Sequence, residues 1–507
     1  MINLQPSTFE EFEHEASRGE MVPVVRTVLA DLQTPVGSFM RVAGESSYAF
    51  LLESVEGGER IARYSFIGAE PEMIVRGRGD VTLVERRGGE VETLAGVRAI
   101  DFLRDYFRGR RLARRPGLAP MAGGAVGYLA YEAARWFEPS LDGEIKSSDA
   151  HDDAVFMIFR TVLAFDRVRQ QIEITSVVPT DETGGSRPRL EELYRAAVEE
   201  TERIEKRLME GDGVYKTTAG THRTGAEQEP SAFISNWSKR DFEGAVEKVR
   251  ESILAGDCYQ VVLSQRLSRR VGASPLDIYR ALRATNPSPY MFHLRLGDES
   301  VIGASPEMLV RCRGQRLDYR PIAGTRRRGT METEDWLLGE ELRADEKEVA
   351  EHVMLVDLGR NDLGRVSDYG SVEVDELMSV ERYSHVQHLV THLRGRLRDT
   401  RDRFDALAAC FPAGTVTGAP KVRAMKIIGE LEPEARGTYA GAVLYVDYAD
   451  NLDSCIAIRT IMLRGTHAEV QAGAGIVADS VPEREYEETL NKARALLNAI
   501  EMAERGL

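Results

Sequence analysis

Apolar and polar residues alternate most regularly in the second half of the chain. Between residues 240 and 254, apolar side chains from Phe242 to Ile253 recur at the spacing of one helical face, and residues 259–267 then alternate like a strand. Further strands are expected at 291–296, 308–312, 386–393, 441–448, 455–463 and 469–473, and further helices at 345–358, 420–431 and 483–504. Strands therefore come in runs with helices inserted, which favours an α+β fold over a doubly wound parallel sheet.

The first half of the chain mixes short strand-like runs with glycine-rich turns. The apolar and aromatic run at 47–52 is followed by a Gly-Gly pair, and residues 123–131 join small residues to aromatics. Two strands are expected at 157–165 and 171–178, and a helix follows at 190–209. This half is therefore expected to contain mainly β-structure.

A change of composition divides these two halves. Residues 211–230 are rich in Gly, Thr and Glu and show no hydrophobic period, which is typical of a linker. We therefore predict an N-terminal domain at 1–210, a linker at 211–232 and a second domain at 233–507.

Charge and cysteine content narrow the classes of function. The 507 residues carry a formal net charge of -16, which argues against binding nucleic acid or an anionic membrane. We find no signal-peptide pattern and no run of about 18 apolar residues that would span a bilayer. The four cysteines are scattered without a CxxC pair, which favours a reducing, cytoplasmic location.

Paired carboxylates stand on two of the expected helices. Glu348 and Glu351 are three residues apart, as are Glu485 and Glu488, so each pair shares a helical face. Carboxylates from two elements, completed by water and substrate, are what magnesium prefers. On spacing alone, however, two solvated helix faces are favoured over a metal site.

Three histidines also resemble metal ligands. His388 and His392 would share one face of the strand at 386–393, whereas His385 would point away. This arrangement disfavours a zinc site made of all three and leaves either packing or a single catalytic histidine.

Three loops are built from small residues, at 321–325, 414–421 and 472–475. Such loops allow backbone N–H groups to approach an anion closely, although each one alone could be a simple turn. The second loop lacks the Gly-Lys-Ser/Thr ending of a phosphate-binding Walker loop. Arg459 and Lys492 could add positive charge for a carboxylate. Together with the acidic helices, these features describe a magnesium-assisted site for a small polycarboxylate.

Long motifs in the C-terminal half resemble the chorismate-utilising enzymes. The matching runs are PIAGT (321–325), DEKEVAEHVMLVDLGRNDLGRV (345–366), GTVTGAPKVRAM (414–425), DSCIAIRT (453–460) and AGAGIVADSVPEREYEETLNKA (472–493). The N-terminal part is similar to the companion domain of anthranilate synthase component I, through LLES (51–54), RYSFIG (63–68) and GGAVGYLAYE (123–132). The resemblance implies two packed antiparallel sheets flanked by helices, a four-layer α/β/β/α sandwich, with an N-terminal companion domain.

The same resemblance implies roles for individual residues. Glu351 and Glu488 would bind Mg²⁺, which holds the ring carboxylate of chorismate. His388 and Thr415 would contact the reacting ring, and Glu348 would act as the general acid for the departing hydroxyl. The residues implied to bind the substrate are Gly324, Thr325, Tyr439, Arg459, Gly473, Ala474, Gly475 and Lys492.

Two positions discriminate between activities within the family. Relatives that aminate C4 commonly carry lysine where this chain has Ala323, and relatives that add water at C2 use a lysine base where it has Gln260. The resemblance therefore implies a lyase of tryptophan biosynthesis that aminates chorismate at C2 with ammonia and eliminates pyruvate to give anthranilate. The alternatives are aminodeoxychorismate or aminodeoxyisochorismate synthase component I, and a catalytically silent tryptophan-binding regulator. A di-metal carboxylate bundle is disfavoured because neither acidic helix carries Glu-x-x-His.

The resemblance also implies a regulator and a partner. Ser54, Pro289, Tyr290 and Met291 would line a pocket for tryptophan as feedback inhibitor. No cysteine lies in a glycine-rich nucleophile turn with a downstream His-Glu pair. A separate glutamine amidotransferase subunit is therefore expected to supply ammonia, which makes the chain part of a hetero-oligomer.

Overall fold

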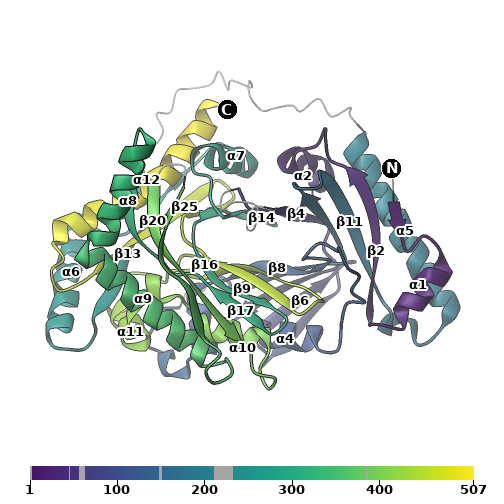
Figure 1. The fold of residues 1–507 in the computed structure, drawn as a ribbon, viewed down its shortest axis with the longest axis horizontal. Coiled ribbons are helices and arrows are strands. Elements are labelled where there is room, and N and C mark those ends of the chain that lie inside the picture. The colour runs from purple at the N-terminus through teal and green to yellow at the C-terminus, as the bar shows by residue number, and fades with distance from the viewer. Residues whose placement is uncertain (1–2, 45, 56–62, 148–150, 211–231, 384–385) are drawn as a thin grey trace.

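Two large antiparallel β-sheets pack face to face with helices on their outer sides (Figure 1). The computed structural model describes residues 3–44, 46–55, 63–147, 151–210, 232–383 and 386–507. Its layers confirm the expected four-layer α/β/β/α sandwich. Nearly all of the predicted linker at 211–232, and His385, lie outside the described residues.

The first sheet contains 13 strands. In spatial order it runs β1 (Asn3–Gln5), β2 (Met21–Leu29), β11 (Gln171–Pro179), β10 (Thr161–Asp166), β4 (Tyr64–Ala69), β3 (Tyr48–Glu53), β14 (Tyr290–Leu296), β15 (Glu299–Ser305), β24 (Thr460–Arg464), β25 (His467–Ile476), β13 (Gln260–Arg270) and β12 (Ile234–Ser235). The short β21 (Gly418–Ala419) pairs with the start of β13.

The second sheet contains 12 strands. Its order is β18 (Ile322–Arg327), β20 (Val386–Arg396), β17 (Arg316–Tyr319), β16 (Met308–Arg313), β23 (Asn451–Ile456), β22 (Ala442–Val446), β8 (Gly124–Leu129), β9 (Ala154–Phe159), β5 (Met73–Arg78), β6 (Val81–Arg86) and β7 (Val91–Ala95). The strand β19 (Glu373–Arg382) pairs with β20.

Helices cover the outer face of each sheet. The first sheet is covered by α1 (Phe9–Ala16), α2 (Pro35–Ala43), α5 (Arg187–Met209), α6 (Lys239–Leu254), α7 (Pro275–Thr285), α11 (Lys421–Leu431) and α12 (Pro482–Arg505). The second is covered by α4 (Ala99–Phe107), α8 (Glu332–Ala344), α9 (Glu346–Gly364) and α10 (Arg403–Cys410). Among the described helices, none is both long and apolar enough to cross a membrane.

Apolar side chains fill most of the space between the two sheets. Phe50 and Phe159, from opposite sheets, meet edge to face with ring centroids 4.9 Å apart. Phe292 and Met462 extend this core into the C-terminal part. Burial of this apolar area is the main force that holds the sheets together. All four cysteines are buried and none forms a disulfide.

Both sheets are shared between the first and second halves of the chain. In the first sheet β3 pairs with β14, with Met291 opposite Glu53, and in the second β8 pairs with β22. Figure 1 shows these early strands, drawn in purple and blue, beside green and yellow strands of the later part. The division into two domains stays a prediction, but neither sheet is confined to one of them.

Two predicted strands are wrong in the same way. Residues 157–165 form the end of β9 in the second sheet and the start of β10 in the first, and residues 455–463 are likewise split between β23 and β24. The chain changes sheet at Arg160 in one case and at residues 457–459 in the other. Because both strands of each pair are buried, the apolar run continues across the change and hides it.

Candidate active site

The acidic face of α9 lies near the start of β13. Asp345 caps the helix by accepting hydrogen bonds from the backbone N–H groups of Lys347 (3.1 Å) and Glu348 (3.2 Å). Glu351 is partly buried, and its Oε1 lies 3.5 Å from Nε2 of Gln260. Burial, and then the neighbouring Glu348 carboxylate, raises the pKa of the Glu351 carboxyl. This face is therefore not simply a solvated helix surface.

Two lysines, Lys347 and Lys492, lie near the acidic face of α12 and also near that of α9. Burial raises the pKa of the Glu485 carboxyl, and the like charge of Glu488 adds to the rise. The ammonium groups of Lys347 and Lys492 act on both Glu351 and Glu485, which shows that the two helix faces lie close together. Within the described ranges, no three His, Cys, Asp or Glu side chains form a ready metal site. The arrangement thus offers carboxylates from two helices rather than a closed cage.

His388 is oriented by the PIAGT loop. Its Nδ1 lies 2.7 Å from the carbonyl oxygen of Gly324 and 3.2 Å from Oγ1 of Thr325. Because a carbonyl oxygen only accepts, we assign the ring proton to Nδ1, which leaves the Nε2 lone pair available. Burial lowers the pKa of His388, so the ring is neutral at neutral pH.

His392 belongs to a different cluster. Its Nε2 lies 3.0 Å from Oδ1 of Asp318, and its Nδ1 lies 3.9 Å from Oδ2 of Asp375. The two described histidines of β20 therefore have separate partners, and only His388 lies at the PIAGT loop.

Close packing explains two glycines of the loop at 472–475. A Cβ atom on Gly473 would lie 2.7 Å from the Tyr439 hydroxyl, and one on Gly475 would lie 2.5 Å from Nε2 of Gln260. The Gly473 carbonyl oxygen accepts a hydrogen bond from Nζ of Lys492 at 3.1 Å, and Lys492 also pairs with Glu488 at 2.7 Å. At Gly473 the Cβ atom would also lie 2.9 Å from the Leu263 carbonyl oxygen, so only a bare backbone fits there, whereas at Gly475 the end of the Gln260 side chain would have to shift. Ala474, one of the predicted substrate-binding residues, packs its side chain away from this contact, in the core formed with α6 and α11.

Arg459 is a partly buried cation without an acidic partner. It sits where the chain passes from β23 to β24, in the left-handed region at φ 51°. It forms no ion pair with any described residue, and burial lowers the pKa of its guanidinium. The buried phenol of Tyr439, whose pKa is raised to about 12, stays protonated as a hydrogen-bond donor. The two side chains are suited to a carboxylate of a ligand.

Glu307 is a candidate that sequence reasoning missed. Its side chain is buried, and burial raises its pKa to about 8 despite the opposing effects of the Thr415 hydroxyl and the Lys492 ammonium. The Thr415 Oγ1 atom is buried and makes no full hydrogen bond with the described residues. The site therefore contains a carboxylic acid that is protonated at neutral pH beside a hydroxyl available to a ligand. A lone Glu between the apolar strands β15 and β16 was the only signal in the sequence.

Comparison with known proteins agrees with this geometry. The family model for chorismate binding enzymes matches residues 47–498. The chain belongs to the chorismate binding enzyme family. It is 47% identical over 499 residues to "Anthranilate synthase component 1" of Acetivibrio thermocellus (98% of each chain) and 43% identical over 512 residues to that of Aquifex aeolicus (99% of each chain).

Solved structures of the family share the fold. The crystal structure of anthranilate synthase component I from Streptococcus pneumoniae superposes with a TM-score of 0.72 at 36% identity, covering 92% of this chain and 98% of that one. A menaquinone-specific isochorismate synthase from Escherichia coli shares the fold alone, with a TM-score of 0.68 at 20% identity. The family match begins at residue 47 and so includes much of the N-terminal part.

Glu348, unlike the buried Glu307, forms an ion pair with a guanidinium group in this chorismate binding enzyme. Its Oε1 lies 3.2 Å from the Arg326 guanidinium, which also pairs with Asp345 at 2.6 Å. Glu307, by contrast, is a buried carboxyl beside the Thr415 hydroxyl, and burial raises its pKa to about 8. The acid role predicted for Glu348 stays a prediction, and Glu307 is the stronger candidate.

The four residues predicted to bind tryptophan meet at the β3–β14 junction. The Ser54 hydroxyl donates to the Pro289 carbonyl, and Met291 is buried on β14. The Tyr290 hydroxyl donates to Asp453 at 3.1 Å. The structure thus brings all four together, at the place where the N-terminal and C-terminal strands join.

A buried carboxylate organises the same junction. Glu53 accepts from the Tyr279 hydroxyl at 2.6 Å and from the Arg283 guanidinium at 2.9 Å. It also pairs with Arg167 at 3.1 Å. Elements from both halves of the chain therefore converge on one side chain beside Ser54.

Proposed function

We propose that this chain aminates chorismate at C2 with ammonia and eliminates pyruvate to give anthranilate, in the pathway to tryptophan. The proposal rests on how positive and negative charges are distributed in the site. The cation of Arg459, which forms no ion pair with the described part of the chain, and the neighbouring carboxylates of α9 and α12 suit a dicarboxylate that binds together with a divalent cation. Relatives named anthranilate synthase component 1, which match over nearly the whole chain, support this choice.

The acidic helices fit a magnesium ion. Burial, and after it the like charge of a neighbouring carboxylate, raises the pKa of Glu351 and of Glu485, and a bound cation would offset both effects. Glu351 and Glu488 would hold the ion, with Glu485 as a further carboxylate. Bound there, magnesium would neutralise the ring carboxylate and withdraw electron density from the ring.

Glu307 as an acid and His388 as a base would carry out the proton transfers. Ammonia forms a bond to C2 while the ring double bonds shift and the C4–O bond breaks. Neutral Glu307 gives its proton to the departing hydroxyl, which leaves as water, and Thr415 steadies that oxygen by hydrogen bonding. The ammonium group on C2 then loses a proton, which restores the neutral Glu307 acid. In the second step, Nε2 of His388 takes the proton from C2 as the bond between the ring and the enolpyruvyl oxygen breaks. That proton passes to the departing pyruvate enolate, and the ring becomes aromatic.

Gln260 supports amination over hydration. A primary amide cannot deprotonate water, whereas ammonia already is a nucleophile. Gln260 is buried between Glu351 and Gly475, so it would bound the site without supplying a base. The main alternatives within the family remain the two aminodeoxy products, which a product assay separates.

We further propose that tryptophan inhibits the chain at the β3–β14 junction. The contact between Ser54 and Pro289, beside the Glu53 cluster, joins strands of the two halves. A ligand held there could therefore shift one half relative to the other. The cytoplasmic location and the glutamine amidotransferase partner belong to the same proposal.

The direct test combines the chain with chorismate, magnesium and an ammonium salt at alkaline pH. We expect fluorescence of anthranilate, which should disappear with a chelator and return with added magnesium. Glu351→Gln and Glu488→Gln should lose turnover while staying folded. The control Glu487→Gln, at a half-exposed position on α12, should keep both its turnover and its fold. A different product of chorismate, or none, would overturn the proposal.

A further inference from the structure

A buried arginine, Arg436, lies between the segments that carry several of the substrate-binding residues. Its side chain is 1% exposed, and its guanidinium forms a two-point ion pair with Glu432 at 2.6 and 2.9 Å. The same guanidinium donates to the carbonyl oxygen of Val416 at 2.8 Å and to that of Val262 at 2.7 Å. Arg436 therefore joins the end of α11, the loop at 414–421 and the strand β13.

Both of these carbonyl groups lie next to residues that are implied to bind chorismate. Val416 directly follows Thr415 in the loop at 414–421. Val262 lies opposite Gly475 where β13 pairs with β25. The Arg436 guanidinium thus sets the distance between the Thr415 loop and the loop at 472–475.

The Arg436 guanidinium also lies over two aromatic rings. Its Cζ atom is 4.8 Å from the ring centroid of Tyr131 and 5.5 Å from that of Tyr439. Cations are attracted to the faces of such rings. The hydroxyl of Tyr439 in turn lies against Gly473, because a Cβ atom there would be 2.7 Å from it. A third substrate-binding segment is therefore held by the same side chain.

A carboxylate from the N-terminal half fixes the backbone that carries Arg436. Glu132 is 4% exposed and accepts hydrogen bonds from the backbone N–H groups of Arg436 at 2.8 Å and Gly437 at 3.1 Å. The backbone N–H of Tyr131 donates to the Gly437 carbonyl oxygen at 2.8 Å. Residues 131–132 thus hold the turn that leads from Arg436 to Tyr439.

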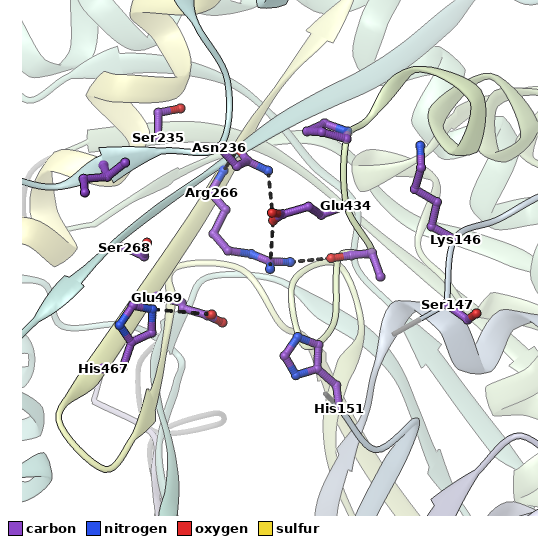
Figure 2. Close-up of a pocket in the computed structure, with 13 residues that line it drawn as sticks. Lys146, Ser147, His151, Ser235, Asn236, Arg266, Ser268, Glu434, His467 and Glu469 are labelled. Carbon is purple, nitrogen blue, oxygen red and sulfur yellow. Dashed lines mark hydrogen bonds and ion pairs between the residues drawn. The ribbon is translucent and has the colours of Figure 1, made fainter. Parts of the chain in front are cut away.

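The segment just before Arg436 depends on polar contacts too. Residues 433–435 border a polar cavity of about 690 Å³, so they face open space on that side (Figure 2). Figure 2 shows Arg266 of β13 reaching toward Glu434, with which it pairs at 3.3 Å. Arg266 also donates to the Ala435 carbonyl oxygen. Arg436 is therefore anchored through its neighbours on both sides in the chain.

Stability alone does not explain this arrangement. Replacing a buried ion pair by apolar residues of similar volume is often neutral or stabilising, because burial of both charges is costly. Arg436 donates four hydrogen bonds, two to Glu432 and two to backbone carbonyl groups. The planar fork of a guanidinium allows this geometry, whereas a lysine ammonium has only three N–H groups.

We propose that Arg436 is a positioning residue of the chorismate site, and that Glu132 fixes Arg436 from the N-terminal half. Arg436 keeps the Thr415 loop, the loop at 472–475 and the Tyr439 ring at the separation that the substrate requires. The inference rests on the proposed function, which takes these three segments as one wall of the site. Both residues act through the segments that they hold, and a displacement of ~1 Å in such a wall can cost a factor of about 10² in rate.

Arg436→Lys removes the guanidinium fork and keeps a positive charge beside Glu432. The matched control is Arg269→Lys, because Arg269 is also buried, pairs with Glu504 and lies over the Phe233 ring with its Cζ 4.5 Å from the centroid. Arg269 stands on the same strand as Val262 but seven residues further on, which is about 24 Å along β13.

The two lysine variants should lose similar stability and differ in catalysis. We expect Arg436→Lys to lower kcat/KM for chorismate by roughly 10- to 100-fold and to leave the KM for ammonia unchanged. Arg269→Lys should stay near wild type in both constants, while urea unfolding shows comparable midpoints for the two variants. An equal loss of kcat/KM in both variants, or a wild-type value in Arg436→Lys, would overturn the positioning role.

Glu132→Gln tests the anchor with a change that keeps the shape of the side chain. A glutamine amide has one acceptor oxygen, so the N–H of Arg436 or of Gly437 loses its partner. The control is Glu173→Gln, because Glu173 is also buried and accepts from the backbone N–H of Ala119 at 3.0 Å. We expect the KM for chorismate to rise roughly fivefold in Glu132→Gln, as for one lost hydrogen bond, and to stay unchanged in Glu173→Gln.

Equal KM values in Glu132→Gln and Glu173→Gln would refute the anchor, even if Arg436→Lys did not fold. Failure of the proposed function would be seen separately, because the wild-type chain would then form no anthranilate from chorismate and ammonia. Calorimetric titration with chorismate would in that case still measure whether Arg436→Lys and Glu132→Gln weaken binding relative to their controls, and unchanged binding would overturn the inference.

Discussion

Replacing Glu307 by glutamine should stabilise the chain and abolish its catalysis. Burial raises the pKa of this carboxyl from an ordinary 4.5 to about 8, so the group takes up a proton when the chain folds. A tenfold change in proton affinity is worth ~1.4 kcal/mol, so this uptake costs the folded state ~3 kcal/mol at pH 7. Glutamine has nearly the same shape and carries no such cost.

The raised pKa of Glu307 sets the direction in which the free energy of unfolding changes with pH. Because the folded pKa is raised, the native state holds more protons than the unfolded state between about pH 4.5 and pH 8, and wild-type stability falls as the pH rises through that window. The stability gained by Glu307→Gln should therefore be near zero at pH 4.5 and reach ~5 kcal/mol above pH 8.

Thermal or urea unfolding across pH 5 to 9 measures the difference in stability between Glu307→Gln and wild type. Thermal midpoints should be compared at one scan rate, because large chains often unfold irreversibly. Glu92→Gln, at a half-exposed side chain on β7, is the surface control. The rate of anthranilate formation, expressed per concentration of free NH₃, should fall for wild type above pH 8 and be lost in Glu307→Gln. A stability gap that does not vary with pH would show that Glu307 is ionised in the folded chain, and its role as proton donor would have to be abandoned.

Three further substitutions test other parts of the site. Ser54→Phe should keep the ammonia-dependent rate but lose inhibition by tryptophan, whereas Ser54→Ala should stay inhibited; an unchanged inhibition curve for Ser54→Phe would remove the regulatory assignment. Arg459→Gln removes a charged hydrogen bond worth ~2–3 kcal/mol, so the KM for chorismate should rise roughly 30- to 150-fold, and steady-state kinetics at saturating magnesium would show a normal KM if Arg459 does not bind the substrate. Arg436→Met leaves Glu432 buried without its partner and should destabilise the chain by ~3–5 kcal/mol, which a thermal midpoint equal to that of wild type would contradict.

Local patterns in the sequence were sufficient for features that depend on one element. The spacing of Glu348 and Glu351 placed them correctly on one helix, and the alternation of β20 put His388 on a different face from its buried neighbour Leu389. The small-residue loops were also identified, because close backbone approach requires the absence of side chains.

Features that arise from contacts between distant segments could not be predicted in this way. Glu307 has an ordinary sequence context, and its protonated state arises only because β15, β16 and the Thr415 loop bury it together. The changes of sheet at Arg160 and at residues 457–459 were hidden because side chains on both sides are equally buried. Register between strands such as β3 and β14 is likewise set by the tertiary fold.

The sharing of both sheets between early and late strands has a consequence for synthesis. The edge of β8 that finally pairs with β22 is complete at Leu129, but its partner ends at Val446, about 300 residues later. At 5–20 residues per second, the ribosome needs roughly 15–60 s to supply it. Throughout that interval the nascent chain carries open strand edges in both sheets, which are templates for pairing with other chains. Newly made protein therefore has to be kept from its neighbours until translation has passed the chorismate motifs, and an N-terminal half released early would have no means of closing either sheet.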